Sequence, residues 1–228
     1  RTLRAIECGI GVVPGTADGR KAGSGVSVQR SFERPGVSGD AASTVPRLGV
    51  GAFTALAAGY FLSYLFNSTS AVIAHDLRAD FGLTPERLGL IGAAHFLFFA
   101  AAQIPVGVLI DRYGVGLVQS ALLLLAGIGS ALFSIADHWL LLLAGRAMVG
   151  VGVSGALLSG LKVIVQTVPA DRVALASGML VAMGTLGAVA ATAPLAWILE
   201  AVGWRGAFAG LAIASLALAL CIGCIIAP

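Results

Sequence analysis

Six long apolar runs constrain this chain more than any other feature of its sequence. They follow one another from about residue 48 and cover residues 48–74, 88–110, 115–136, 139–168, 173–199 and 206–227. A helix of about 20 residues is about 30 Å long, which is the thickness of the hydrocarbon core of a bilayer. A membrane β-barrel would instead need alternating segments of about 10 residues. The sequence therefore predicts an all-α membrane protein, a bundle of six transmembrane helices.

The composition agrees with a protein that lives in lipid. Hydrophobic residues make up 58% of the chain and charged residues only 11%, and the mean hydropathy is +0.96. Soluble domains carry about a quarter charged residues. Basic residues that flank membrane spans account for the net charge of +3. Because no basic cluster alternates with aromatic residues, we expect lipid as a partner and no nucleic acid.

Residues 1–47 differ from the rest of the chain. They are rich in Gly, Ser, Arg and Pro without a sustained period, so we expect a disordered or extraneous segment. Seven of the fourteen Lys and Arg residues lie in it. Cytoplasmic segments carry an excess of such residues. This bias predicts a cytoplasmic N-terminus, and six spans return the C-terminus to the same side. We expect a multi-pass protein of the cell membrane, in a bacterium the inner membrane.

Ionisable residues inside a membrane span are costly and often functional. Here they are His95, Arg146 and Lys162. Asn67, His95 and Arg146 each lie about seven residues, or ~10 Å, from the expected outer end of their span. Three polar groups from three helices are therefore predicted at one depth. For Lys162, which lies near the inner end, snorkelling to the surface is slightly favoured over a role in an inner cavity.

The first span carries a polar stripe in a helix that is otherwise apolar. Tyr60, Ser63, Tyr64 and Asn67 follow the i, i+3, i+4, i+7 spacing of one helical face. This pattern is typical of a helix that lines a wet cavity. The alternatives stay open: the two tyrosines can equally pack between helices, Arg146 can bond neighbouring carbonyl groups, and a packed structural role is favoured for His95.

Short charged connections separate the apolar runs. Gly107 and Gly114 bracket a predicted tight turn that carries Asp111 and Arg112, and Asp171 with Arg172 occupies the connection before the fifth run. The longest connection is about 75–87. In it, Gly82 suits the C-terminus of one helix. Thr84 suits the N-cap of the next, with Pro85 at its first position.

Glycines are frequent in the fourth and fifth runs. Gly150, Gly152 and Gly155 spell G-x-G-x-x-G, but a dinucleotide site needs a strand before this motif, and here it lies inside a span. We expect these glycines, with Gly184, Gly187 and Pro194, to serve close packing of helices. The sequence has no P-loop, no nucleophile–base pair and no metal-ligand spacing. It predicts no enzyme, no cofactor and no metal.

Taken together, these motifs resemble the N-terminal half of a major facilitator superfamily transporter. The turn has that family's spacing: Gly107, three residues, Asp111-Arg112, one residue and Gly114. Arg146 followed by Gly150 resembles its span-four motif, and Gly203-Trp204-Arg205 is a common lead into span six. Two features depart from the pattern. After the turn, Gly116-Leu117 stands where the family usually has basic residues. In span five, antiporters of the family tend to have Gly-Gly two residues after a proline, and here Trp197-Ile198 stands at that place after Pro194.

The resemblance implies one half of a twelve-helix carrier in which two six-helix halves rock around a central site. Spans one and four would line the cavity, Tyr60, Tyr64 and Asn67 would hydrogen-bond the solute, and Arg146 would supply a cation. Asp111 would close the inner gate. The expected function is secondary active transport of a small polar or anionic solute, with His95 the candidate in this half for a coupling proton. The expected partner is a second six-span half, either a missing C-terminal half or a second copy. The alternatives are a truncated or scaffold half that does not transport, and a drug–proton antiporter.

Overall fold

A computed structural model describes residues 49–226, and this part of the chain is helical throughout, without strands. The helices are α1 (Val50–Val72), α2 (Ala74–Phe81), α3 (Pro85–Tyr113), α4 (Val115–Ser134), α5 (Trp139–Val153), α6 (Ala156–Thr167), α7 (Val173–Ala190) and α8 (Ala193–Ile226). The predicted all-α class is confirmed. The segment expected in residues 1–47 lies outside the described residues.

The helices correspond to the six apolar runs. Five helical stretches among the described residues have the length and hydropathy to cross a membrane: Pro85–Tyr113, Val115–Ser134, Trp139–Thr167, Val173–Ala190 and Ala193–Ile225. They coincide with most of the second to sixth runs. The first run corresponds to α1, whose 23 residues are also long enough to span. The chain is a multi-pass membrane protein.

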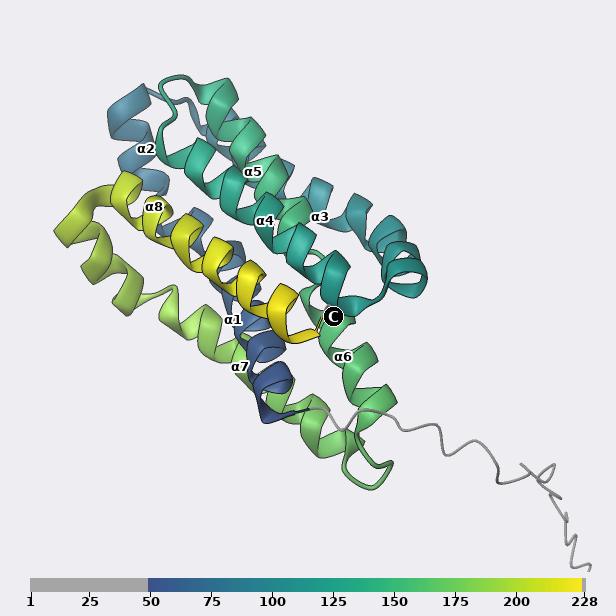
Figure 1. Ribbon diagram of the computed structural model, residues 1–228. Coiled ribbons are helices and arrows are strands. Elements are labelled where there is room, and N and C mark those ends of the chain that lie inside the picture. Colours follow the sequence, from purple (N-terminus) through teal and green to yellow (C-terminus); the bar gives the residue numbers. More distant parts are fainter. Residues whose placement is uncertain (1–48, 227–228) are drawn as a thin grey trace, which may run out of the picture. The chain divides into compact units, whose positions relative to one another are not determined.

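Two breaks depart from uninterrupted spans. The fourth run is divided into α5 and α6 at Ser154–Gly155. The fifth run extends beyond α7 into the first seven residues of α8, and α8 then turns at Gly203, which has a φ of +71°. Glycine adopts this left-handed region without the steric penalty of other residues. In Figure 1 the two arms of α8 run in opposite directions, so the reversal lies within the element.

The caps around α2 and α3 form as predicted from local sequence. Gly82 ends α2 with a φ of +58°, and its N–H donates to the carbonyl of Arg78. Thr84 is the N-cap of α3, where its side chain accepts from the N–H of Arg87 at 3.5 Å, and Pro85 follows at the first helical position. These terminal groups need partners because helix ends leave backbone donors and acceptors unpaired.

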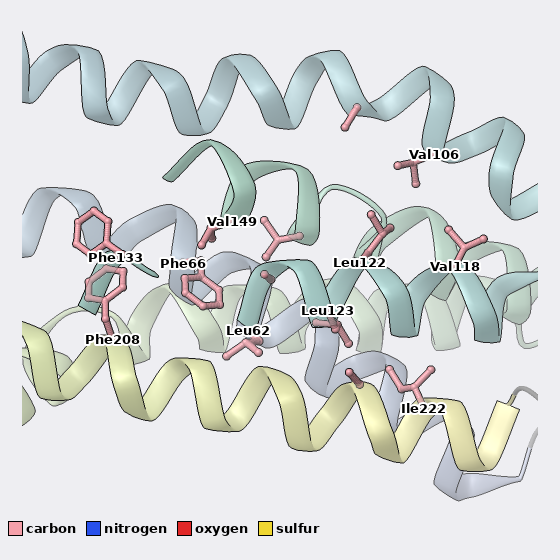
Figure 2. Close-up of a cluster of buried hydrophobic side chains, with 14 of the residues drawn as sticks. Leu62, Phe66, Val106, Val118, Leu122, Leu123, Phe133, Val149, Phe208 and Ile222 are labelled. Atoms are coloured by element: carbon pink, nitrogen blue, oxygen red, sulfur yellow. The ribbon is translucent and has the colours of Figure 1, made fainter. Parts of the chain in front are cut away.

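Helix α4 packs along both α5 and α8, α3 packs on α5, and α1 packs on α7 (Figure 1). One cluster of buried apolar side chains draws on α1 to α6 and on α8, and Figure 2 shows Phe133 of α4 facing Phe208 of α8. Their ring centroids are 4.3 Å apart. Large apolar side chains such as Ile104 and Ile213 are exposed on the outside of the helices. A surface of this kind suits lipid rather than water.

The predicted packing glycines lie where two helices approach closely. A Cβ at Gly150 would collide with the carbonyl oxygen of His95, and one at Gly187 would collide with that of Phe61. A Cβ at Gly152, Gly155 or Gly184 would come within about 2.5 Å of an atom of another helix. Small residues at such contacts are the usual device of membrane helix packing. Pro194, expected with them, instead lies exposed in the first turn of α8. Proline fits there because its missing N–H would have no helical partner.

Candidate functional site

The polar stripe of α1 lines a cavity of about 300 Å³. Its lining residues are Tyr60, Ser63, Tyr64, Asn67, Phe99, Gln103, Val153, Ser154, Leu157 and Leu158. Hydroxyl and amide groups thus come from α1, from α3 and from the break between α5 and α6. All its lining side chains are uncharged at neutral pH. Such a set suits hydrogen bonding to a small polar molecule, and the volume is at the lower end of known ligand sites.

Two contacts fix the α1 face of this cavity. Tyr60 and Tyr64 pack edge to face with ring centroids 5.0 Å apart. Ser63 donates to the carbonyl oxygen of Val153 at 3.2 Å, at the last residue of α5. That carbonyl lies where the fourth run breaks into α5 and α6, and the break leaves it without a partner in its own helix. The Ser63 hydroxyl supplies the hydrogen bond that the carbonyl lacks.

Asn67 also connects to α3 through His95. The Nε2 of His95 lies 2.6 Å from the Oδ1 of Asn67, and because an amide oxygen accepts, Nε2 donates. His95 is fully buried, and its Nδ1 has no partner among the described residues. The imidazole therefore orients the Asn67 side chain that lines the cavity. It does not line that cavity itself.

Arg146 of α5 is the largest of the side chains that are essentially inaccessible to solvent. Its Nη1 donates to the carbonyl oxygen of Phe66 at 3.3 Å. The guanidinium carbon lies 5.3 Å from the ring centre of Phe133 and 5.2 Å from that of Phe208. Aromatic faces attract a cation at this range. No carboxylate among the described residues lies within ion-pair distance of it.

The structure divides the predicted cavity residues between two pockets. Tyr60, Tyr64 and Asn67 share the cavity described above, whereas Arg146 lies in the wall of a second pocket of about 300 Å³. His95 lies in the wall of neither. The two pockets follow one another along α1 and α3: the first is lined by residues 60–67 and by Phe99 and Gln103, the second by Ser70 and by residues 85–92. A shared depth inferred from the sequence did not distinguish them.

The charged turn after α3 is shorter than the sequence suggested. Helix α3 continues to Tyr113, so Gly107, Asp111 and Arg112 lie on its last turns, and only Gly114, with a φ of +84°, stands between α3 and α4. Arg112 is exposed beside the ring of its neighbour Tyr113. The charged groups do not end the helix because its last turns lie beyond the apolar run, where water solvates them.

Lys162 of α6 reaches this turn. Its Nζ lies 2.6 Å from the Oδ1 of Asp111 and donates to the carbonyl oxygen of Ile110 at 3.1 Å. The sequence analysis did not predict this partner for Lys162, although both residues lie near the ends of their apolar runs. Asp171 and Arg172, between α6 and α7, form a looser exposed pair at 3.7 Å.

A further polar cluster at the opposite ends of these helices was not predicted. Trp204 of α8 donates its indole N–H to Oδ2 of Asp80 in α2 at 2.7 Å. Arg205 donates to the carbonyl oxygen of Ser134 at the end of α4, at 3.0 Å, and lies over the Trp204 ring. The charged and aromatic residues in the connections at about 75–87 and 200–205 could have indicated this cluster from the sequence.

Comparison with known proteins agrees with this architecture. Residues 56–228 match the family model described as Major Facilitator Superfamily. The chain belongs to the major facilitator superfamily. The predicted family is confirmed.

Individual relatives of this superfamily member are distant. The chain is 31% identical over 157 residues to the probable sulfoacetate transporter SauU of Cupriavidus necator, which covers 69% of this chain and 36% of that protein. It is 30% identical over 128 residues to the nitrate/nitrite transporter NrtP of a Picosynechococcus species, covering 56% of this chain and 24% of that one. The chain thus spans about a third or less of the length of these relatives.

A solved structure shares the fold. The bacterial homologue of the human lysosomal transporter Spinster, in an inward-facing and unoccupied conformation, matches with a TM-score of 0.68 at 22% identity. The match covers 76% of this chain and 42% of that one. This likeness supports the helical architecture and carries no information on the solute.

Proposed function

We propose that this protein is part of a secondary active transporter that moves a small polar or anionic solute by alternating access. The observation that carries the proposal is the polar stripe on one face of α1, which lines a cavity shared with α3 and the break between α5 and α6. The stripe consists of Tyr60, Ser63, Tyr64 and Asn67. Polar groups at this depth are costly unless a neighbour or a bound solute uses them. The relatives named above are described as transporters of sulfoacetate and of nitrate or nitrite, which are anions.

In this proposal Tyr60, Tyr64 and Asn67 hydrogen-bond the solute, His95 orients Asn67, and Arg146 supplies the positive charge. A second six-span half, from the same protein or a second copy, closes the other side of the cavity. His95 is the candidate in this half for a coupling proton. We propose no enzymatic activity for the protein.

The inner turn is proposed as the gate. Asp111 and Arg112, with Gly107 and Gly114, lie at the end of α3, and Asp171 with Arg172 lies in the connection after α6. These charges favour the cytoplasm for this side, together with both chain termini. The membrane is proposed to be the cell membrane.

The test is solute uptake into proteoliposomes that contain the purified protein. Sulfoacetate and nitrate, both radiolabelled, are offered with and without a proton gradient, and counterflow with unlabelled solute identifies carrier behaviour. We expect saturable uptake that Asn67→Leu reduces and the exposed control Ile213→Ala does not. Absence of uptake by a protein with intact helix content would favour a non-transporting scaffold. Proton-driven export of lipophilic dyes instead of uptake would favour a drug–proton antiporter.

A further inference from the structure

Helix α1 is accessible from outside the bundle along one narrow strip. Thr54 is exposed, and Ala58, Phe61 and Leu65 are partly accessible. These four residues follow the i, i+4, i+7, i+11 spacing of a single helical face. The polar stripe of residues 60–67 lies roughly 140° away around the same helix, by its period of 3.6 residues. The accessible strip therefore faces away from the polar cavity.

This strip forms the floor of a furrow. Helices α7 and α8 each pack on α1, but they pack little on each other. In Figure 1, α1 is visible between α7 and the yellow arm of α8. Two helices that flank a third without closing over it leave a furrow along it.

Two pockets follow one another along this furrow. The first lies between α1 and α7, holds about 380 Å³, and includes Thr54 and Ala182 in its wall. The second lies between α1 and α8, holds about 410 Å³, and includes Ala217 and Cys221. The α1 residues in the two walls fall between positions 53 and 62, a length of ~14 Å along the helix.

The walls of the two pockets offer no free polar group to a polar ligand. No charged residue lines either pocket. The hydroxyl of Thr54 donates to the carbonyl oxygen of Gly51 in its own helix, at 3.0 Å. The thiol of Cys221 is only a weak donor. Every other lining side chain is that of Ala, Leu, Phe or Met. Whatever enters the furrow is therefore hydrocarbon.

The surroundings of the furrow decide among apolar occupants. The furrow runs between helices of membrane-spanning length, so lipid chains surround it. A second six-span half that closes the polar cavity cannot also cover the furrow, because the furrow faces nearly the opposite side of α1. A helix with its side chains is about 10 Å across. Pockets of 380 Å³ and 410 Å³ suit one flexible chain better than a helix.

We propose that this furrow binds one acyl chain of a membrane phospholipid. The chain lies on the strip of Thr54, Ala58 and Phe61 and fills the space between α7 and α8. Because no charged residue lines the pockets, the affinity depends on the acyl chain and not on the headgroup. The inference goes beyond the transport role and does not depend on it.

The binding experiment is native mass spectrometry of the purified protein in mild detergent. We expect part of the protein to carry one phospholipid. After removal of lipid, dioleoylphosphatidylglycerol and dioleoylphosphatidylcholine have the same chains but different headgroups, and both should restore the bound form. Both should also raise the melting temperature, since a ligand that binds only the folded state stabilises it. No bound lipid in any of these states, or binding of only one of the two lipids, overturns the proposal.

Variants that fill the furrow locate the chain. Ala182→Leu and Ala217→Leu place larger apolar side chains in the two pockets, at exposed positions that leave room for them, and leucine keeps the helix. Ala101→Leu is the matched control, because Ala101 is exposed on α3 and lines neither pocket. We expect the double variant of Ala182 and Ala217 to lose the bound lipid and the control to keep it. Equal lipid binding in both overturns the assignment.

The same spectra test a second copy of this chain as the occupant. Wild-type monomers that carry lipid uphold the proposal. A lipid-free dimer that Ala217→Leu separates into monomers would assign the furrow to a protein contact and overturn it. A phosphatidylcholine with a photoreactive diazirine in its acyl chain then maps the contact. We expect crosslinks within residues 53–62 or 214–221, whereas crosslinks spread equally over the exposed face of α3 would overturn the site.

Discussion

Lys162 of α6 and Asp111 of α3 form an ion pair between two helices, with Nζ and Oδ1 2.6 Å apart. The pair is not enclosed by the bundle, since 76% of the Asp111 side chain and 26% of the Lys162 side chain are accessible. It links the turn between α3 and α4 to the end of the interrupted fourth run.

Replacing Lys162 with Met is expected to cost less than about 1 kcal/mol of unfolding free energy, because exposed ion pairs contribute little. If the turn is the inner gate, the effect on uptake rate should be larger than the effect on stability. Asp111→Asn should change stability and uptake rate as Lys162→Met does. The double variant should lose no more uptake than either single variant. Fully additive losses in uptake would show that the two residues act separately. The comparison needs melting curves and uptake rates at low and high salt.

Gly150→Ala should destabilise the packing of α3 on α5. Its new Cβ would collide with the carbonyl oxygen of His95, and overpacking of this kind costs about 1–3 kcal/mol. Gly178→Ala is the control: a Cβ there meets no atom within 4 Å, and alanine favours the helix by up to about 1 kcal/mol. Melting in detergent measures both. A Gly150→Ala protein as stable as the wild type would contradict the close approach.

Trp204→Phe removes the indole donor to Asp80 while keeping an aromatic ring in the cluster with Phe133. Hydrogen bonds to charged groups contribute roughly 1.5–3 kcal/mol. Because Asp80 is exposed, we expect the free energy of unfolding to fall by an amount near the lower end of that range. Amide exchange in α2 should speed up, since this bond ties α2 to α8. Trp197→Phe serves for comparison, as Trp197 is exposed. Unaltered exchange in α2 would count against the tether.

The His95–Asn67 hydrogen bond can be measured by a double-mutant cycle with His95→Leu and Asn67→Leu. Each single variant leaves a buried or half-buried polar partner unsatisfied, which costs about 1–3 kcal/mol. The double variant should cost less than the sum, with a coupling energy above about 0.5 kcal/mol. Additive losses would mean that the two groups do not interact.

The sequence by itself determined the features that depend on local physics. Helices form along the apolar runs because backbone groups in lipid must pair within their own segment. Gly82 and Thr84 end and begin helices through contacts within a few residues. The polar stripe from Tyr60 to Asn67 follows from the period of one helix. The motif around Asp111 and the glycine after Arg146 identified the family.

Only the tertiary structure decided which of these groups meet. The sequence predicted one depth for Asn67 and Arg146, yet the two residues line different pockets, because the packing of the helices decides which side chains meet. Lys162 finds Asp111, and Trp204 finds Asp80, across 51 and 124 residues. No local pattern encodes such distances. These contacts form where α6 meets α3 and where α8 meets α2, and the packing of the helices depends on side-chain volumes at every contact at once.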